Sequence, residues 1–171
     1  NTFGIAFYGG GSNMISENTA NSNSVGGINV GAYGSSSNNN IISNNTVNSN
    51  ANAGIGIVGN NNIISNNTVN SNANGINLAW SSYTTIANNN LNSNSGAGIL
   101  AAMSSHYNTF LGNKFNNNLV GISLALSNNN LISNNTFNSN FGSIDIVGNN
   151  NLISNNTINS SRNLGITLGS S

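Results

Sequence analysis

A Gly-Ile pair followed by a second apolar residue recurs along the whole chain, and this repeat restricts the fold more than any other feature. Gly precedes the repeated Ile in every case except one, where Ser143 takes its place. Two further short segments follow each pair except the last, as at residues 62–65 and 67–72. The repeated residues, spaced by 23 positions on average, are Ile5, Ile28, Ile55, Ile76, Ile99, Ile122, Ile144 and Ile166. A period of this length is typical of a solenoid.

Within each segment, apolar residues alternate with small or polar ones, which indicates a β-strand with one buried face. No segment shows helical periodicity, and Asn, Ser and Gly are poor helix formers. Three short strands per repeat predict one coil of a three-sided parallel β-helix. We therefore expect an all-β fold, with a single β-solenoid domain over residues 1–171 and about seven coils. This domain is either complete or an excerpt of a longer repeat array.

Asn makes up 47 of the 171 residues and occupies fixed positions of the repeat. In a parallel stack, equivalent residues lie about 4.8 Å apart, so each side-chain amide can bond to the next one in a ladder. Gln is absent, as expected if a longer side chain would not fit this spacing. The first ladder is predicted at Asn18, Asn45, Asn67, Asn89, Asn113, Asn135 and Asn156. Two further ladders are predicted at Asn23, Asn50, Asn72, Asn94, Asn118, Asn140 and Ser161, and at Asn13, Asn40, Asn62, Thr84, Asn108, Asn130 and Asn151.

Segments such as residues 60–69 followed by residues 75–78 resemble the NosD-type repeats of the pectate-lyase-like superfamily. The resemblance covers nearly the entire chain and implies a right-handed parallel β-helix. Such repeats are common in surface and periplasmic proteins of archaea and bacteria. The superfamily contains lyases, hydrolases, epimerases, adhesins and structural fibres, so the resemblance indicates a fold and leaves the function open.

Charged side chains are almost absent, since the chain has only Glu17, Lys114, Asp145 and Arg162. Two basic residues cannot neutralise a run of phosphates, so nucleic acid is not expected as a partner. The longest apolar runs span a few residues, so no membrane insertion is expected. The chain has no Cys, which leaves its redox compartment undetermined.

No catalytic or metal site is predicted, and no cofactor. Glu17 and Asp145 fall on different coils, about 25 Å or more apart at about 4.8 Å per coil, too far to act together on one glycosidic bond. His106 follows two Ser residues but lacks an orienting carboxylate. NosD carries an association with copper, yet a single His and the thioethers of Met14 and Met103 do not make a copper site.

Two surface features are candidates for contacts. Residues that precede the buried Ile of the second strand include Met14, Ile41, Ile63, Leu131 and Leu152. They form an exposed apolar contact stripe if the strand alternates strictly, or turn inward if the strand lies at a corner. The turn after the first strand carries Tyr8, Tyr33, Trp80, Tyr83 and Tyr107. These rings could stack on sugars, but their uneven spacing favours packing against one another.

The outward positions of the third strand form a Thr-x-Asn pattern, with Thr replaced by Asn90 and Lys114 in two repeats. Regular hydroxyl arrays on flat solenoid faces can order water, but these interruptions argue against ice binding. The outward turns also carry five N-glycosylation sequons, for which we expect partial occupancy at best because neighbouring glycans would crowd. The acceptor residues are Asn44, Asn66, Asn134, Asn155 and Asn159.

No amphipathic capping helix is predicted at either end of the solenoid, and uncapped parallel strands can pair with further strands. The first hypothesis is therefore a non-enzymatic structural subunit of an extracellular filament or surface layer. Its partners would be copies of itself, stacked head to tail and in lateral contact. The alternative is an extracellular or cell-surface module that binds carbohydrate or, less plausibly, ice.

Overall fold

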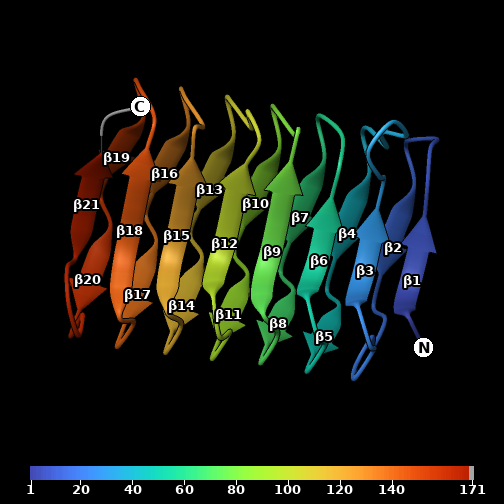
Figure 1. The fold of residues 1–171 in the computed structure, drawn as a ribbon, viewed down its shortest axis with the longest axis horizontal. Coiled ribbons are helices and arrows are strands. Elements are labelled where there is room, and N and C mark those ends of the chain that lie inside the picture. Colours follow the sequence, from blue (N-terminus) through green and yellow to red (C-terminus); the bar gives the residue numbers. More distant parts are fainter. Residues whose placement is uncertain (170–171) are drawn as a thin grey trace.

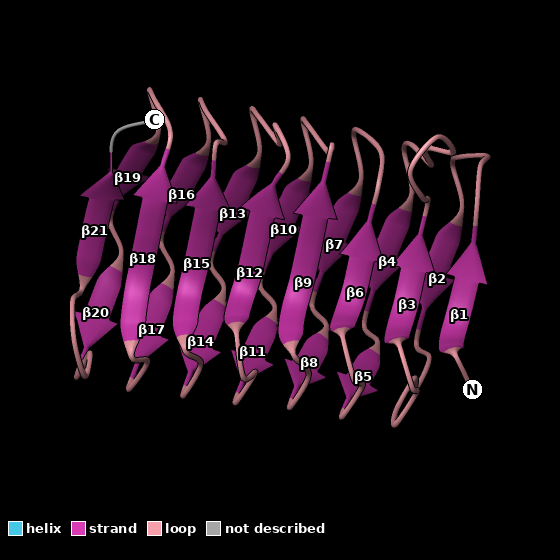
Figure 2. Ribbon diagram, viewed as in Figure 1, coloured by secondary structure: helices cyan, strands magenta, loops and turns pink. Residues whose placement is uncertain are grey.

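The computed structural model describes residues 1–169, and these residues form a solenoid of stacked β-strands (Figure 1). Three parallel sheets run along its axis and are joined by short turns, with no helix among the described residues (Figure 2). A helix long and apolar enough to cross a membrane is accordingly not found in residues 1–169.

The first sheet contains the repeated Gly-Ile segments in eight parallel strands. They are β1 (Phe3–Phe7), β3 (Gly26–Val30), β6 (Ala53–Ile57), β9 (Asn74–Ala79), β12 (Ala97–Ala102), β15 (Val120–Ala125), β18 (Gly142–Val147) and β21 (Ile166–Gly169). Every repeated Ile pairs with the Ile of the next coil, as Ile55 does with Ile28 and Ile76. The register expected from the Ile spacing is therefore the observed one.

The second and third sheets are built from three-residue strands. The second consists of β2 (Met14–Ser16), β4 (Ile41–Ser43), β7 (Ile63–Ser65), β10 (Thr85–Ala87), β13 (Thr109–Leu111), β16 (Leu131–Ser133) and β19 (Leu152–Ser154). The third consists of β5 (Thr46–Asn48), β8 (Thr68–Asn70), β11 (Asn90–Asn92), β14 (Lys114–Asn116), β17 (Thr136–Asn138) and β20 (Thr157–Asn159). In the first coil, only an isolated bridge between Thr19 and Thr46 occupies the place of the third strand. The described chain thus comprises seven coils and the first strand of an eighth.

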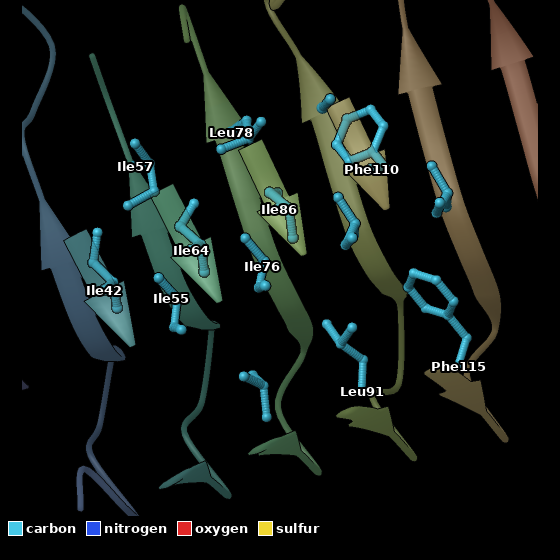
Figure 3. Packing of buried hydrophobic residues seen from close by; sticks show 14 of the residues in the cluster. Ile42, Ile55, Ile57, Ile64, Ile76, Leu78, Ile86, Leu91, Phe110 and Phe115 are labelled. Carbon is cyan, nitrogen blue, oxygen red and sulfur yellow. The ribbon is translucent and has the colours of Figure 1, made fainter. Parts of the chain in front are cut away.

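Columns of apolar side chains fill the space between the three sheets (Figure 3). Ile55, Ile57 and Ile64 are almost fully buried, and their equivalents in neighbouring coils continue the columns. Phe115 and Phe137 occupy one column in adjacent coils and stack with their ring centroids 4.7 Å apart. The core is therefore continuous along the axis, so each coil is stabilised by its neighbours.

The Gly of the Gly-Ile pair is required by close packing. A Cβ atom at Gly54 would lie 2.5 Å from Cγ1 of Val69 and 2.8 Å from Nδ2 of Asn72. The one exception is accommodated in the structure, because Ser143 lies in the coil where the ladder Asn is replaced by the shorter Ser161. The hydroxyl oxygens of these two Ser residues are 2.7 Å apart and share a hydrogen bond.

Asn ladders run through the turns as predicted. Asn67 is almost fully buried, and its Oδ1 accepts hydrogen bonds from the backbone N–H and the Nδ2 of Asn45, at 2.9 Å and 3.0 Å. Its own Nδ2 donates to Oδ1 of Asn89 and to the backbone carbonyl of Ile42. The ladder therefore satisfies both its own amides and the backbone groups of the turns, which would otherwise be buried without partners.

Candidate functional site

The turns that connect the first sheet to the second carry most of the exposed aromatic side chains. We call these segments the first turns; they lie along the top of Figure 1. They comprise residues 8–13, 31–40, 58–62, 80–84, 103–108, 126–130 and 148–151. All five aromatic residues singled out in the sequence are in these turns, with exposed fractions from 45% for Trp80 to 83% for Tyr33.

Four of these aromatic rings meet in two pairs. Tyr33 lies in the longest of the first turns and contacts Trp80, which belongs to a turn two coils away; their ring centroids are 5.2 Å apart. Tyr83 and Tyr107 lie in adjacent coils and stack almost in parallel, at 5.2 Å and 4°. Ring-to-ring packing therefore accounts for part of the cluster, but all four rings keep large areas in contact with solvent.

Large residues occupy left-handed backbone positions in three consecutive first turns. Trp80, Met103 and Leu126 have φ angles of 48°, 55° and 53°. Equivalent positions in the first and third coils are Gly9 and Gly59, which adopt positive φ angles without a steric penalty. A non-glycine residue in this conformation costs about 1–2 kcal/mol. The turn itself does not require these large side chains.

Met103 and Leu126 are exposed, like Trp80, and were not predicted from the sequence as contact residues. Alignment of the repeats could have identified them, because both are large apolar residues at a position that holds Gly in other coils. We call Trp80, Met103 and Leu126 the apolar row. The residues just before the first two, Ala79 and Ala102, are paired in register, so the row follows the helix axis.

His106 is part of a ladder on the outside of the first turns. Its Nδ1 accepts a hydrogen bond of 2.9 Å from the backbone N–H of Asn128. The backbone N–H of His106 donates to the hydroxyl of Ser82. In other coils, Oδ1 of an Asn takes the place of the His106 Nδ1: Asn60 accepts from the backbone N–H of Ser82, and Asn128 accepts from that of Asn149. Because Nδ1 is an acceptor, neutral His106 carries its proton on Nε2, which leaves this N–H as a donor.

The predicted apolar stripe lies on the outer face of the second sheet. Met14, Ile63 and Leu152 are exposed, whereas Ile41 and Leu131 are half-buried. The next residue along each strand points into the core, as Ile64 does after Ile63. Successive side chains of these strands therefore alternate between the outer face and the core. Thr85 and Thr109 interrupt the stripe in the fourth and fifth coils.

The five sequon residues are all exposed. Asn44, Asn66, Asn134 and Asn155 follow strands of the second sheet in left-handed conformation, with φ between 53° and 56°. Asn159 ends β20 and donates from Nδ2 to Oδ1 of Asn138. On the outer face of the third sheet, Asn138 and Asn116 are linked to each other in the same way, and Lys114 is exposed where the Thr-x-Asn pattern is interrupted.

The few ionisable side chains are dispersed. Glu17 is in the turn after β2, whereas Asp145 points outward from β18 in the seventh coil. Arg162 donates to Oδ1 of Asn117. Within residues 1–169, no group of three or more His, Cys, Asp or Glu residues could hold a metal ion.

A shallow depression lies on the outer face of the first sheet. Gly56 forms its floor, because it has no side chain between the outward side chains of Asn29 and Asn77. Phe3 and Val58 contribute to its apolar lining. The surface thus offers two features: a small notch of mostly apolar lining with a few Asn side chains on this sheet, and an extended aromatic and apolar edge along the first turns.

Solved structures with a similar fold include a complex with a sugar and several epimerases. A complex of XylC with xylose superposes with a TM-score of 0.73 and 17% identity, over 87% of this chain and 31% of that one. The A-module of the mannuronan C-5 epimerase AlgE4 of Azotobacter vinelandii gives 0.73 and 15%, over 95% and 54%. The periplasmic alginate epimerase AlgG gives 0.67 and 20%, over 99% and 47%.

The chain spans about half or less of each of these proteins, and at such low identity the likeness shows a common fold alone. A comparison with curated protein sequences found no match. The family model that describes a right-handed β-helix region matches residues 3–158, which is most of the chain. The match is to this family as a whole and does not single out the NosD type. This chain belongs to the right-handed β-helix family.

Proposed function

We propose that this chain is a carbohydrate-binding module of a secreted or cell-surface protein, and that the first turns form its sugar-binding surface. The observation that carries the proposal is the group of exposed aromatic rings along one edge of the solenoid. An aromatic ring offers a flat apolar face to the C–H groups of a sugar ring, and the Tyr hydroxyl and Trp N–H groups can hydrogen-bond at its rim. Similarity in fold to XylC and to alginate epimerases supports a role connected with sugars.

Packing alone does not explain the position of Tyr33. Its ring contacts Trp80, yet 83% of the residue remains exposed, so the contact buries little apolar surface. The hydrophobic free energy gained is proportional to the area removed from water, and here it is small. A bound sugar would cover the exposed faces of both rings and provide the missing burial.

The proposal can be tested by affinity electrophoresis of the chain in gels that contain different polysaccharides. We expect at least one polysaccharide to retard the chain, and Tyr33→Ala and Trp80→Ala to reduce the retardation. Phe141→Ala is the matched control, since Phe141 is an aromatic residue of similar exposure in the turn before β18, at another edge. Absence of retardation by any polysaccharide, or equal effects of all three substitutions, would contradict the proposal.

Stacking of copies into a filament is a second candidate. It is supported by β21, which pairs only with β18 among the described residues and exposes Ile166 and Leu168. Unpaired strand edges with apolar side chains favour addition of a further strand. Sedimentation of the 171-residue chain at high concentration would then show large assemblies, and Thr167→Lys would reduce their size. A monomer at all concentrations would exclude the filament.

A further inference from the structure

We infer that the ligand of the first turns is an uncharged glycan chain that lies along the helix axis over the apolar row and beside His106. This inference rests on the proposed function and specifies its ligand class and the direction of the bound chain. It adds Met103, Leu126 and His106 to the aromatic residues as ligand contacts.

The direction follows from the arrangement of the row. Trp80, Met103 and Leu126 come from three consecutive coils, and neighbouring coils are about 4.8 Å apart, so the row extends over about 10 Å parallel to the axis. All three side chains are exposed. A surface of this length is larger than a single sugar ring, so it fits several consecutive units of a chain better than a terminal sugar.

The side chains of the row are present although the backbone would adopt its conformation more easily without them. Gly fills the equivalent position in the first and third coils, so the coil is completed there without a large side chain. The contribution of the three residues is therefore the apolar surface that they expose. A ligand that covers this surface stabilises the complex in proportion to the apolar area removed from water.

The lack of charge in the first turns defines the ligand class. The four charged side chains of the protein lie elsewhere: Glu17 after the second sheet, Lys114 on the third sheet, Asp145 within β18, and Arg162 before β21. A uronate polymer would bring a carboxylate on each sugar into this surface with no cation to pair with it, and partial dehydration of an unpaired carboxylate is unfavourable. An uncharged glycan meets no such penalty.

His106 supplies a directional contact from the same first turn that carries Met103. The hydrogen bond from Asn128 to Nδ1 fixes the ring and leaves the Nε2–H group as a donor. Hydroxyl oxygens of a sugar are acceptors for such a donor. Tyr107, which follows His106, stacks on Tyr83 and adds an aromatic face next to this donor. Apolar contact and hydrogen bonding thus come together on the turns of the fourth and fifth coils.

The test compares a neutral β-glucan or xylan oligosaccharide with an alginate oligosaccharide of equal length by isothermal titration. We expect the neutral ligand to bind at least about tenfold more tightly. The double variant Met103→Gly and Leu126→Gly should weaken that binding by about tenfold or more. Because Gly adopts a positive φ without the steric cost that Met and Leu carry, the melting temperature of the variant should be equal or higher. Leu119→Ala, an exposed Leu in the turn before β15, is the control and should bind as the unmodified chain does.

Tighter binding of alginate, with the aromatic variants still impaired, would overturn the neutral ligand class and leave the proposed function standing. Unchanged affinity of the double Gly variant for the neutral ligand would overturn the role of the apolar row. If no glycan of either kind binds, the proposed function itself is wrong.

Discussion

Asn67 lies in the middle of the first Asn ladder, so its replacement by Leu is expected to weaken the whole stack. Leu has nearly the same size and shape as Asn but cannot form hydrogen bonds. The substitution removes the acceptor of the Asn45 backbone N–H and the Nδ2 donor to the carbonyl of Ile42. Asn89 still accepts from the backbone N–H of residue 67, and Nδ2 of Asn45 retains two backbone acceptors. The carbonyl of Ile42 keeps its place in the parallel pairing of β4 with β7, so one buried backbone group, the N–H of Asn45, is left without a partner.

A buried group of this kind costs about 1–3 kcal/mol, so the free energy of unfolding should fall by about that amount. For a domain of this size, 1 kcal/mol corresponds to roughly 2–4 °C in melting temperature. We therefore expect the melting temperature, followed by circular dichroism, to fall by about 2–12 °C.

Asn48→Leu is the control for this experiment. Oδ1 of Asn48 accepts a hydrogen bond from the backbone N–H of Asn70, but Asn48 is on the outer face of the third sheet, where water can replace the lost acceptor. Its melting temperature should change by a small fraction of the shift caused by Asn67→Leu. Equal shifts for the two variants would show that the buried ladder does not stabilise the fold as argued.

Three further predictions concern packing and modification. Gly98→Ala places a Cβ 2.6 Å from Cδ1 of Phe115 and 2.8 Å from the carbonyl oxygen of Gly121, which should lower stability in urea unfolding by about 1–3 kcal/mol; Gly142→Ala, whose nearest atoms are 3.8 Å away, should be neutral. Ser161→Asn should be destabilising alone and tolerated together with Ser143→Gly, because the pair then matches the other coils; equal melting of the single and double variants would refute this coupling. Secretion from a glycosylating host should add glycans to some of the sequons of Asn44, Asn66, Asn134, Asn155 and Asn159, and an intact mass equal to the bare sequence would disprove it.

The strand register could be predicted because the same apolar pattern recurs in every repeat. Each Gly-Ile pair places an apolar residue where the next coil needs one, and strict alternation defines the buried face. The Asn positions add an independent constraint at the turns, since Asn45, Asn67 and Asn89 keep their register with the Ile columns. Ser143 was recognised only as an exception to the pattern. Its compensation by Ser161 became evident from the contact between the two hydroxyl groups.

The surface of the first turns was only partly predictable. Exposed aromatic residues were recognised because their residue types are rare in this chain. The contact between Tyr33 and Trp80 spans two coils and depends on the path of a long turn, which periodicity does not specify. Met103 and Leu126 were missed because a single apolar residue in a turn does not indicate exposure; only alignment with the repeats that hold Gly at this position would have done so. His106 was examined as a catalytic residue, whereas the structure places it in a hydrogen-bonded ladder.

The division between buried ladders and exposed turns explains how this fold can carry a binding surface with so few ionisable residues. Hydrogen bonds of the ladders and columns of Ile hold the backbone of every coil in the same place, so the path of the chain does not depend on which side chains the first turns expose. Large residues at left-handed positions are then tolerated, because the strain stays within one turn while the rest of the coil is fixed by its neighbours. Side chains at one turn position are consequently repeated at the spacing of the coils. A regular polymer is the kind of ligand whose own repeat can follow such a surface, which is why we propose an extended glycan, not a compact ligand, for the apolar row.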